Sequence, residues 1–113
     1  MRILRDQTRP LSGLQLTAML RDEEYPASPS LVFRAIRRLI DRGAIRKILV
    51  AGGYAPIRED FAIRLFCSRC GKLREIPCTE TFDALDHVAA TLGFGVLDHI
   101  VEVEGLCGRC AGC

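Results

Sequence analysis

The 113-residue chain has no apolar run that approaches the ~20 residues needed for a membrane-spanning helix. Its first six residues hold two arginines and an aspartate, and so lack the apolar core of a signal peptide. We therefore expect a cytoplasmic protein without a membrane partner. Internal repeats and low-complexity tracts are also missing. With 49% hydrophobic and 27% charged residues, the composition excludes a disordered chain.

Sequence patterns that mark common enzymes are absent as well. The chain has no Ser/His/Asp order, no His-Glu-x-x-His pair and no glycine-rich phosphate loop. The sequence therefore predicts a protein that is not an enzyme.

A large net charge is lacking too, but the charge of +2 is unevenly distributed. Residues 1–60 carry 11 Lys and Arg against 7 Asp and Glu, whereas residues 61–113 carry 5 against 7. The basic first half is the candidate for binding a polyanion.

Six cysteines are present, and four of them form two Cys-x-x-Cys pairs with 36 residues between them: Cys67/Cys70 and Cys107/Cys110. Each two-residue spacer lets one tight turn aim both sulfurs at the same point, and Gly71 tolerates the positive φ that such a turn often needs. Four thiolates make a closed tetrahedral set, which is typical of structural Zn²⁺ and leaves no open position for catalysis. We predict one structural zinc ion per chain.

The sequence leaves alternatives open for the cysteines. Cys113 repeats the spacing after Cys110 and is an alternative ligand in place of Cys107 or Cys110. Cys78 follows Pro77 in a turn, where a half-buried small apolar residue is favoured over a redox or ligand role. Three disulfides would compete in a secreted chain, and a thiol redox sensor would use Cys78 or the four-cysteine set.

The first half has the element order of a winged helix-turn-helix. Residues 11–21 have helical periodicity with Ser12 as N-cap, and a Pro- and Ser-rich stretch at 25–30 breaks the helix. Residues 31–42 predict a second helix with Ser30 as cap and Gly43 at its end. Strand-like segments at 44–50 and 54–57 flank a turn at 51–53. The second helix has one apolar face, comprising Val32, Ala35, Ile36, Leu39 and Ile40.

Basic residues occupy the other face of this helix and continue into the hairpin, at Arg34, Arg37, Arg38, Arg46 and Lys47. Guanidinium groups suit guanine edges and phosphates. A solvated charged face is the alternative interpretation. The order of basic helix and basic hairpin favours double-stranded DNA as the partner.

The second half predicts a small α/β unit around the cysteine pairs. We expect strands at 61–66, 73–76 and 96–104, and a helix at 79–92 with Thr79 as its cap. The apolar face of that helix comprises Phe82, Leu85, Val88, Ala89 and Leu92. Because the character of the chain changes around residues 56–60, we divide it into 1–57 and 58–113, an α+β organisation.

These pieces resemble the ferric uptake regulator superfamily, the Fur, Zur and PerR-type repressors. The likeness covers roughly residues 10–110. It rests on the second helix from Leu31 to Ile45, the run from Cys67 to Lys72, and the series Gly93, Phe94, His99, Glu102, Gly105, Cys107 and Cys110. The resemblance implies a winged-helix DNA reader, a C-terminal dimerisation domain with a Cys₄ zinc, and repression of metal-homeostasis or stress genes.

The resemblance also completes the DNA-binding set. Arg34 falls at the family's signature arginine, and Phe33 precedes it where a tyrosine is commoner. Phe33 would keep apolar contact with a thymine methyl group. The predicted DNA-binding residues are Ser30, Phe33, Arg34, Arg37, Arg38, Arg46 and Lys47.

The chain departs from the family in two respects. Members usually have one more helix before the reader, so this chain resembles an N-terminally trimmed member. The family's sensing-metal ligands are also largely replaced: Phe61, Ala62, Ile63 and Arg64 stand for a His-rich string, and Pro10, Ala55 and Phe82 for other ligands. Glu75 and His99 persist as residual regulatory-metal ligands, but one carboxylate and one imidazole do not make a metal site.

We therefore expect a dimeric repressor that binds pseudo-palindromic DNA, keeps its structural zinc and has largely lost its sensing site. A second metal site recruited from Asp60, Glu75, His99 and Glu102 is an alternative, as is a purely structural His99. A further alternative is an interaction module that binds no DNA and pairs with a full-length relative.

Overall fold

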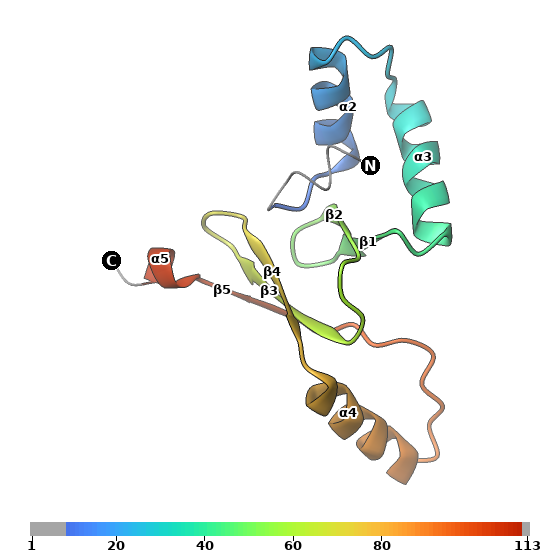
Figure 1. The fold of residues 1–113 in the computed structure, drawn as a ribbon, viewed down its shortest axis with the longest axis vertical. Helices are drawn as coiled ribbons and strands as arrows, with labels where there is room; N and C mark the ends of the chain where they lie inside the picture. The colour runs from blue at the N-terminus through green and yellow to red at the C-terminus, as the bar shows by residue number, and fades with distance from the viewer. Residues whose placement is uncertain (1–8, 112–113) are drawn as a thin grey trace.

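The computed structural model describes residues 9–111, which form a helix-and-hairpin half followed by a sheet-and-helix half (Figure 1). The elements in chain order are α2 (Gly13–Asp22), α3 (Pro29–Asp41), β1 (Ile45–Ile48), β2 (Gly53–Pro56), β3 (Ala62–Cys67), β4 (Leu73–Pro77), α4 (Thr79–Thr91), β5 (Glu102–Gly105) and α5 (Gly108–Ala111). The predicted α+β class is confirmed. The expected N-terminal trimming and the ligand role of Cys113 concern residues outside the described range.

The two N-terminal helices begin at side-chain caps. Ser12 caps α2 as predicted, because its Oγ accepts from the backbone N–H of Gln15 at 3.1 Å and Gln15 Oε1 accepts from the N–H of Ser12 at 2.8 Å. Helix α3 begins earlier than expected, at Pro29, and its cap is Ser28, so the prediction that Ser30 is the cap was wrong. Proline suits the first helical position because its φ is fixed near the helical value.

Helices α2 and α3 pack on the hairpin through one small core, formed by Leu11, Leu16, Val32, Ile36 and Ile45. The predicted apolar face of α3 is only partly correct: Val32 and Ile36 are buried and Leu39 packs against them, whereas Ala35 and Ile40 are exposed.

Strands β1 and β2 pair antiparallel and form the predicted wing. The turn between them covers residues 49–52, so Gly53 starts the returning strand and does not belong to the turn. Leu11 and Tyr54 exchange backbone hydrogen bonds of 3.0 and 2.7 Å, which ties the segment before α2 to the wing. A Cβ atom on Gly53 would lie 3.0 Å from the backbone of Leu11, so glycine permits this close approach.

The second half is a three-stranded sheet in the order β4-β3-β5, with β3 antiparallel to β4 and parallel to β5. Helix α4 follows β4, and Cys78 occupies its N-cap position without a side-chain cap. Thr79 is the first helical residue, so the prediction that it is the cap was wrong.

The segment between α4 and β5 contradicts the predicted strand at 96–104. Only residues 102–105 form a strand, and residues 94–101 are irregular. The carbonyl of Val101 accepts from the N–H of Arg64 at 2.9 Å, which is where pairing with β3 starts. On α4 Phe82 is buried, whereas Leu85, Val88 and Leu92 are exposed, so most of the predicted apolar face is uncovered.

Within the described part of the chain, every helix is too short or too polar to cross a lipid bilayer.

Candidate metal centre and nucleic-acid interface

The four predicted ligands converge at one end of the C-terminal sheet. Cys67 ends β3, and the parallel register that pairs Cys67 with Gly105 brings the second cysteine pair to the same sheet end. Gly71, which follows the first pair, has φ +78° as expected. The four sulfur atoms lie within 4.8 Å of one another, and those of Cys70 and Cys107 are 3.8 Å apart.

This geometry fits a tetrahedral zinc ion, because a Zn–S bond of about 2.3 Å places neighbouring sulfurs about 3.8 Å apart. In the range 9–111, no other group of three or more His, Cys, Asp and Glu side chains is close enough to hold a metal. The cysteine set is therefore the zinc centre of the described chain, with a closed coordination sphere.

Local hydrogen bonds prepare the cysteines unequally for metal binding. The backbone N–H of Cys70 donates to the Sγ atom of Cys67 at 3.4 Å, and this bond, with one from the N–H of Cys107, lowers the pKa of Cys67 to about 5. Hydrogen bonding with the side chains of Cys107 and Cys67 raises the pKa of Cys110 to about 12. A divalent cation at the centre would favour the thiolate form of all four residues.

Helix α3 presents the predicted DNA-binding side chains to solvent. Arg34, Arg37 and Arg38 are exposed, and within the described residues no ion pair or hydrogen bond engages their guanidinium groups. Ser30 lies in the first turn of α3, where its Oγ is 3.4 Å from that of Ser28. The helix thus offers exposed positive charge along one face.

Phe33 has a second contact that the sequence did not reveal. Its ring lies over Gly13, at the start of α2, where a Cβ atom would overlap it. The ring is still 45% exposed, so it is both packed and accessible.

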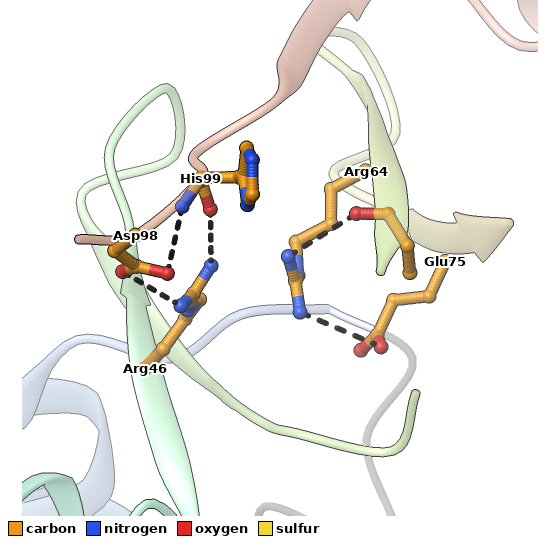
Figure 2. Close-up of polar contacts among 6 residues, drawn as sticks. Arg46, Arg64, Glu75, Asp98 and His99 are labelled. Carbon is orange, nitrogen blue, oxygen red and sulfur yellow. Dashed lines mark hydrogen bonds and ion pairs between the residues drawn. The ribbon is translucent and has the colours of Figure 1, made fainter. Parts of the chain in front are cut away.

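The two basic residues of β1 differ in their surroundings. Lys47 is exposed on the wing. Arg46 turns to the C-terminal half, where its Nη2 lies 3.3 Å from Oδ2 of Asp98 and its Nη1 donates to the carbonyl of His99 at 3.4 Å (Figure 2). The predicted DNA-binding residues of β1 therefore differ: Lys47 is free to meet a ligand on the outer surface, whereas Arg46 contacts the C-terminal half of the chain itself.

Glu75, one of the two persisting regulatory-metal residues, faces a buried cation of the chain itself. Nη2 of Arg64 lies 3.8 Å from Oε2 of Glu75, an oxygen that is buried and accepts no hydrogen bond within residues 9–111. Burial lowers the pKa of the Arg64 guanidinium, and the nearby Glu75 carboxylate opposes that effect. Glu75 also lines a cavity of about 260 Å³ with Pro10 and Ala55, neither of which offers a side-chain ligand.

His99, the other persisting residue, is bonded elsewhere. Its Nε2 lies 2.7 Å from Oδ1 of Asp86 on α4, and its ring meets the ring of Phe82 edge to face at 5.0 Å between centroids. His87 is exposed on α4. Glu75 and His99 do not share a cluster with a third ligand in the described chain.

Sequence reasoning missed the roles of Arg64 and Glu102. Arg64 had a signal, since a charged residue at the centre of an apolar strand is an anomaly. The role of Glu102 had no sequence signal. Its carboxylate accepts from the backbone N–H groups of Leu49 and Val50 at 3.2 and 3.0 Å, which are 52 to 53 residues away in sequence.

Comparison with known proteins gives a consistent group of relatives. No protein-family model matches the chain. The zinc uptake regulation protein of Escherichia coli (strain K12) is 28% identical over 116 residues, covering 97% of this chain and 67% of that protein. The protein of the same name from Shigella flexneri matches equally.

Solved structures of metal uptake regulators resemble the fold of this chain. A zinc uptake regulator complexed with zinc and DNA has a TM-score of 0.87 at 27% identity, covering 98% of this chain and 77% of its own. The holo form of XcZur has a TM-score of 0.85 at 25% identity, with coverages of 99% and 81%. The Helicobacter pylori ferric uptake regulator shares the fold, with a TM-score of 0.74 at 20% identity and coverages of 97% and 75%.

Proposed function

The chain belongs to the ferric uptake regulator family, whose members are transcription regulators and not enzymes, and from that premise we propose that it is a cytoplasmic repressor. It binds pseudo-palindromic double-stranded DNA as a homodimer that contains structural zinc. Residues 1–57 form the DNA-binding domain and residues 58–113 the dimerisation domain. The carrying observation is the likeness, over 98% of the chain, to a zinc uptake regulator complexed with zinc and DNA.

The exposed face of α3 is the proposed reading surface. Its exposed guanidinium groups at Arg34, Arg37 and Arg38 suit base edges and phosphates in the major groove. Ser30 lies near the helix N-terminus, where small polar groups meet phosphates. Phe33 offers apolar contact beside them, and Lys47 carries the wing's contact with the DNA backbone.

Uncovered apolar side chains of the C-terminal half support the homodimer. On α4 and the segment after it, Leu92 is 78% exposed, Phe94 70% and Leu97 102%. Val88 and Ile100 lie in the same stretch and are also exposed. Several large apolar side chains exposed in one stretch of the chain favour an interface. A second copy of the chain would cover it and place two α3 helices on one DNA site.

The sensing site of the relatives is, we propose, largely lost. Glu75 and His99 have protein partners of their own, Arg64 and Asp86. Pro10 and Ala55 replace ligands with apolar side chains. A metal-dependent switch would then have no set of ligands to bind its ion.

The test is fluorescence anisotropy of the zinc-loaded full chain on the DNA upstream of its own gene, with random duplex as the control. We expect preference for the upstream DNA that does not change when Zn²⁺, Fe²⁺ or Mn²⁺ is added. Equal affinity for every duplex would overturn the repressor proposal and favour the interaction module. Co-expression with a full-length family member would then show whether the two chains pair.

A further inference from the structure

The turn of the wing is bound by one carboxylate from the other half of the molecule. Oε2 of Glu102 accepts from the backbone N–H of Leu49 at 3.2 Å, and its Oε1 accepts from that of Val50 at 3.0 Å. Both oxygens are used, on two consecutive amides, which is a strong charge-assisted arrangement. Gly52, with φ +67°, lets the chain turn directly after these amides.

A second contact ties the strand before this turn to the same segment. Arg46 on β1 forms an ion pair of 3.3 Å with Asp98 and a hydrogen bond of 3.4 Å with the carbonyl of His99. The wing is therefore held at two points by residues 98–102, and both contacts join the N-terminal half to the C-terminal half.

A buried positive charge lies next to these contacts. Figure 2 shows Arg64 between His99 and Glu75, and its side chain is only 5% exposed. The guanidinium donates to the carbonyl of Ala62 at 3.5 Å and faces Glu75 at 3.8 Å. A fixed cation at this position repels a divalent ion and occupies the carboxylate that such an ion would need.

We propose that Glu102 and Arg46 lock the wing onto the C-terminal half, and that the buried Arg64–Glu75 ion pair stabilises this junction. No second metal ion is then required to position the DNA-binding half. Glu102 and Arg46 are positioning residues in this scheme, and Lys47 remains the wing residue that meets DNA. The inference extends the proposed function, because it assigns the interdomain role to side chains of this chain.

Amide hydrogen exchange of the zinc-loaded full chain, followed residue by residue by NMR, tests the lock without DNA. We expect the N–H groups of Leu49 and Val50 to be protected with zinc bound only at the four cysteines. Glu102→Ala should make both exchange about tenfold faster, the effect of losing a charge-assisted hydrogen bond. Added Zn²⁺, Fe²⁺ or Mn²⁺ should change neither rate.

Glu104→Gln is the matched control. Glu104 is exposed on the same strand, and its substitution also removes one negative charge. Its substitution should leave the two amides protected. Unchanged protection in Glu102→Ala, or protection that appears only after a second divalent ion is added, would overturn the proposal.

The Arg64–Glu75 pair is tested by a double-mutant cycle on thermal unfolding. Arg64→Met or Glu75→Gln alone leaves one buried polar group without its partner, so each should lower Tm by several degrees. The double variant should lower Tm less than the two single variants combined. Strictly additive shifts would show that the two groups are not coupled and would remove Arg64 from the junction.

The two proposals fail in different ways. The lock would be supported and the repressor proposal overturned by two results together. The amides of Leu49 and Val50 would be protected in the native chain and exchange faster in Glu102→Ala, and the chain would bind all duplexes with equal affinity. Specific DNA binding together with unaltered exchange in Glu102→Ala would sustain the repressor and overturn the lock.

Discussion

The Nε2 atom of His99 lies 2.7 Å from Oδ1 of Asp86, so an imidazole that the family likeness offers as a metal ligand is bonded to a carboxylate of α4. The same ring packs edge to face on Phe82, the most buried residue of that helix. This pair anchors the irregular segment after α4 to the helix, directly beside the residues that contact the wing.

Asp86→Ala should therefore loosen this segment. We expect a loss of about 0.5–1.5 kcal/mol in unfolding free energy, because Asp86 is half exposed and the bond is single. Asp86→Asn keeps an acceptor and should lose less. Urea unfolding of the zinc-loaded chain measures both, with Asp83→Ala as the control on the same helix. An equal loss in that control would remove the special role of Asp86, and zinc content should stay at one per chain throughout.

Removal of the zinc should unfold the C-terminal half. Cys107→Ser breaks the closed ligand set and should abolish zinc binding, at a cost on the order of 10 kcal/mol of binding free energy. Cys78→Ser is the matched control: Cys78 lies outside the cluster, with its Sγ 3.0 Å from Oγ1 of Thr81, and should retain the metal. Metal analysis and circular dichroism check both variants. Full zinc content in Cys107→Ser would contradict the assignment.

The zinc centre should also be sensitive to acid. Without metal, the pKa of Cys110 is raised to about 12, so zinc binding must release at least one proton near neutral pH. Metal binding depresses the thiol pKa, so the stability it contributes is present at neutral pH and is lost as pH falls and the thiolates are reprotonated. Zinc release followed with a chromogenic chelator should rise steadily as pH is lowered. Retention independent of pH would contradict thiolate ligation.

Arg34 and Lys47 should contribute differently to DNA binding. Arg34→Ala should weaken binding to the preferred duplex by about 1–3 kcal/mol and relax sequence preference, as expected for a base contact. Lys47→Ala should weaken all duplexes alike and reduce the salt slope by about one unit. Arg74→Ala, which removes one positive charge at an exposed position of β4, is the control. Anisotropy titrations at several salt concentrations separate these outcomes, and identical sequence-independent losses in both variants would contradict the division.

Gly13→Ala should disturb DNA binding through Phe33. A Cβ atom at Gly13 overlaps the Phe33 ring, and this half-exposed ring can swing outward at little cost to stability. We therefore expect Tm to change little and DNA affinity to fall. Phe33→Ala gives the matched comparison: combining it with Gly13→Ala should add no further loss. Additive losses in the double variant would show that Gly13 acts by another route.

The uncovered apolar surface gives a prediction on assembly. Leu97→Glu should place a charge in the proposed interface and convert dimers into monomers. Leu14→Glu, at an equally apolar exposed site on α2, should leave the assembly intact. Sedimentation velocity measures both, and a dimer that survives Leu97→Glu would place the interface elsewhere.

Local patterns in the sequence were enough to predict the zinc centre and most elements of the first half. The spacing within each cysteine pair and the Gly71 turn depend on residues close in sequence, and so do the Ser12 cap and the wing hairpin. The cap of α3 failed for a local reason, since Ser28 and Ser30 have the same chemistry and only Pro29 decides between them.

Other features depend on partners that are distant in sequence. The hydrophobic pattern of α4 identified a face, but a single chain buries only Phe82 of it. The sequence predicted a strand at 96–104, yet residues 94–101 form none. The contact of Glu102 with the wing turn has no sequence signature, because backbone amides look alike at every position.

The parallel pairing of β3 with β5 also determines the order in which the chain can fold during synthesis. Helices α2 and α3 and the wing are close neighbours in sequence, so their core can form early on the ribosome. The sheet cannot gain its third strand, nor the cluster its last thiolates, until residues 102–110 have emerged. Zinc can therefore complete its ligand set only after the DNA-binding half has been translated.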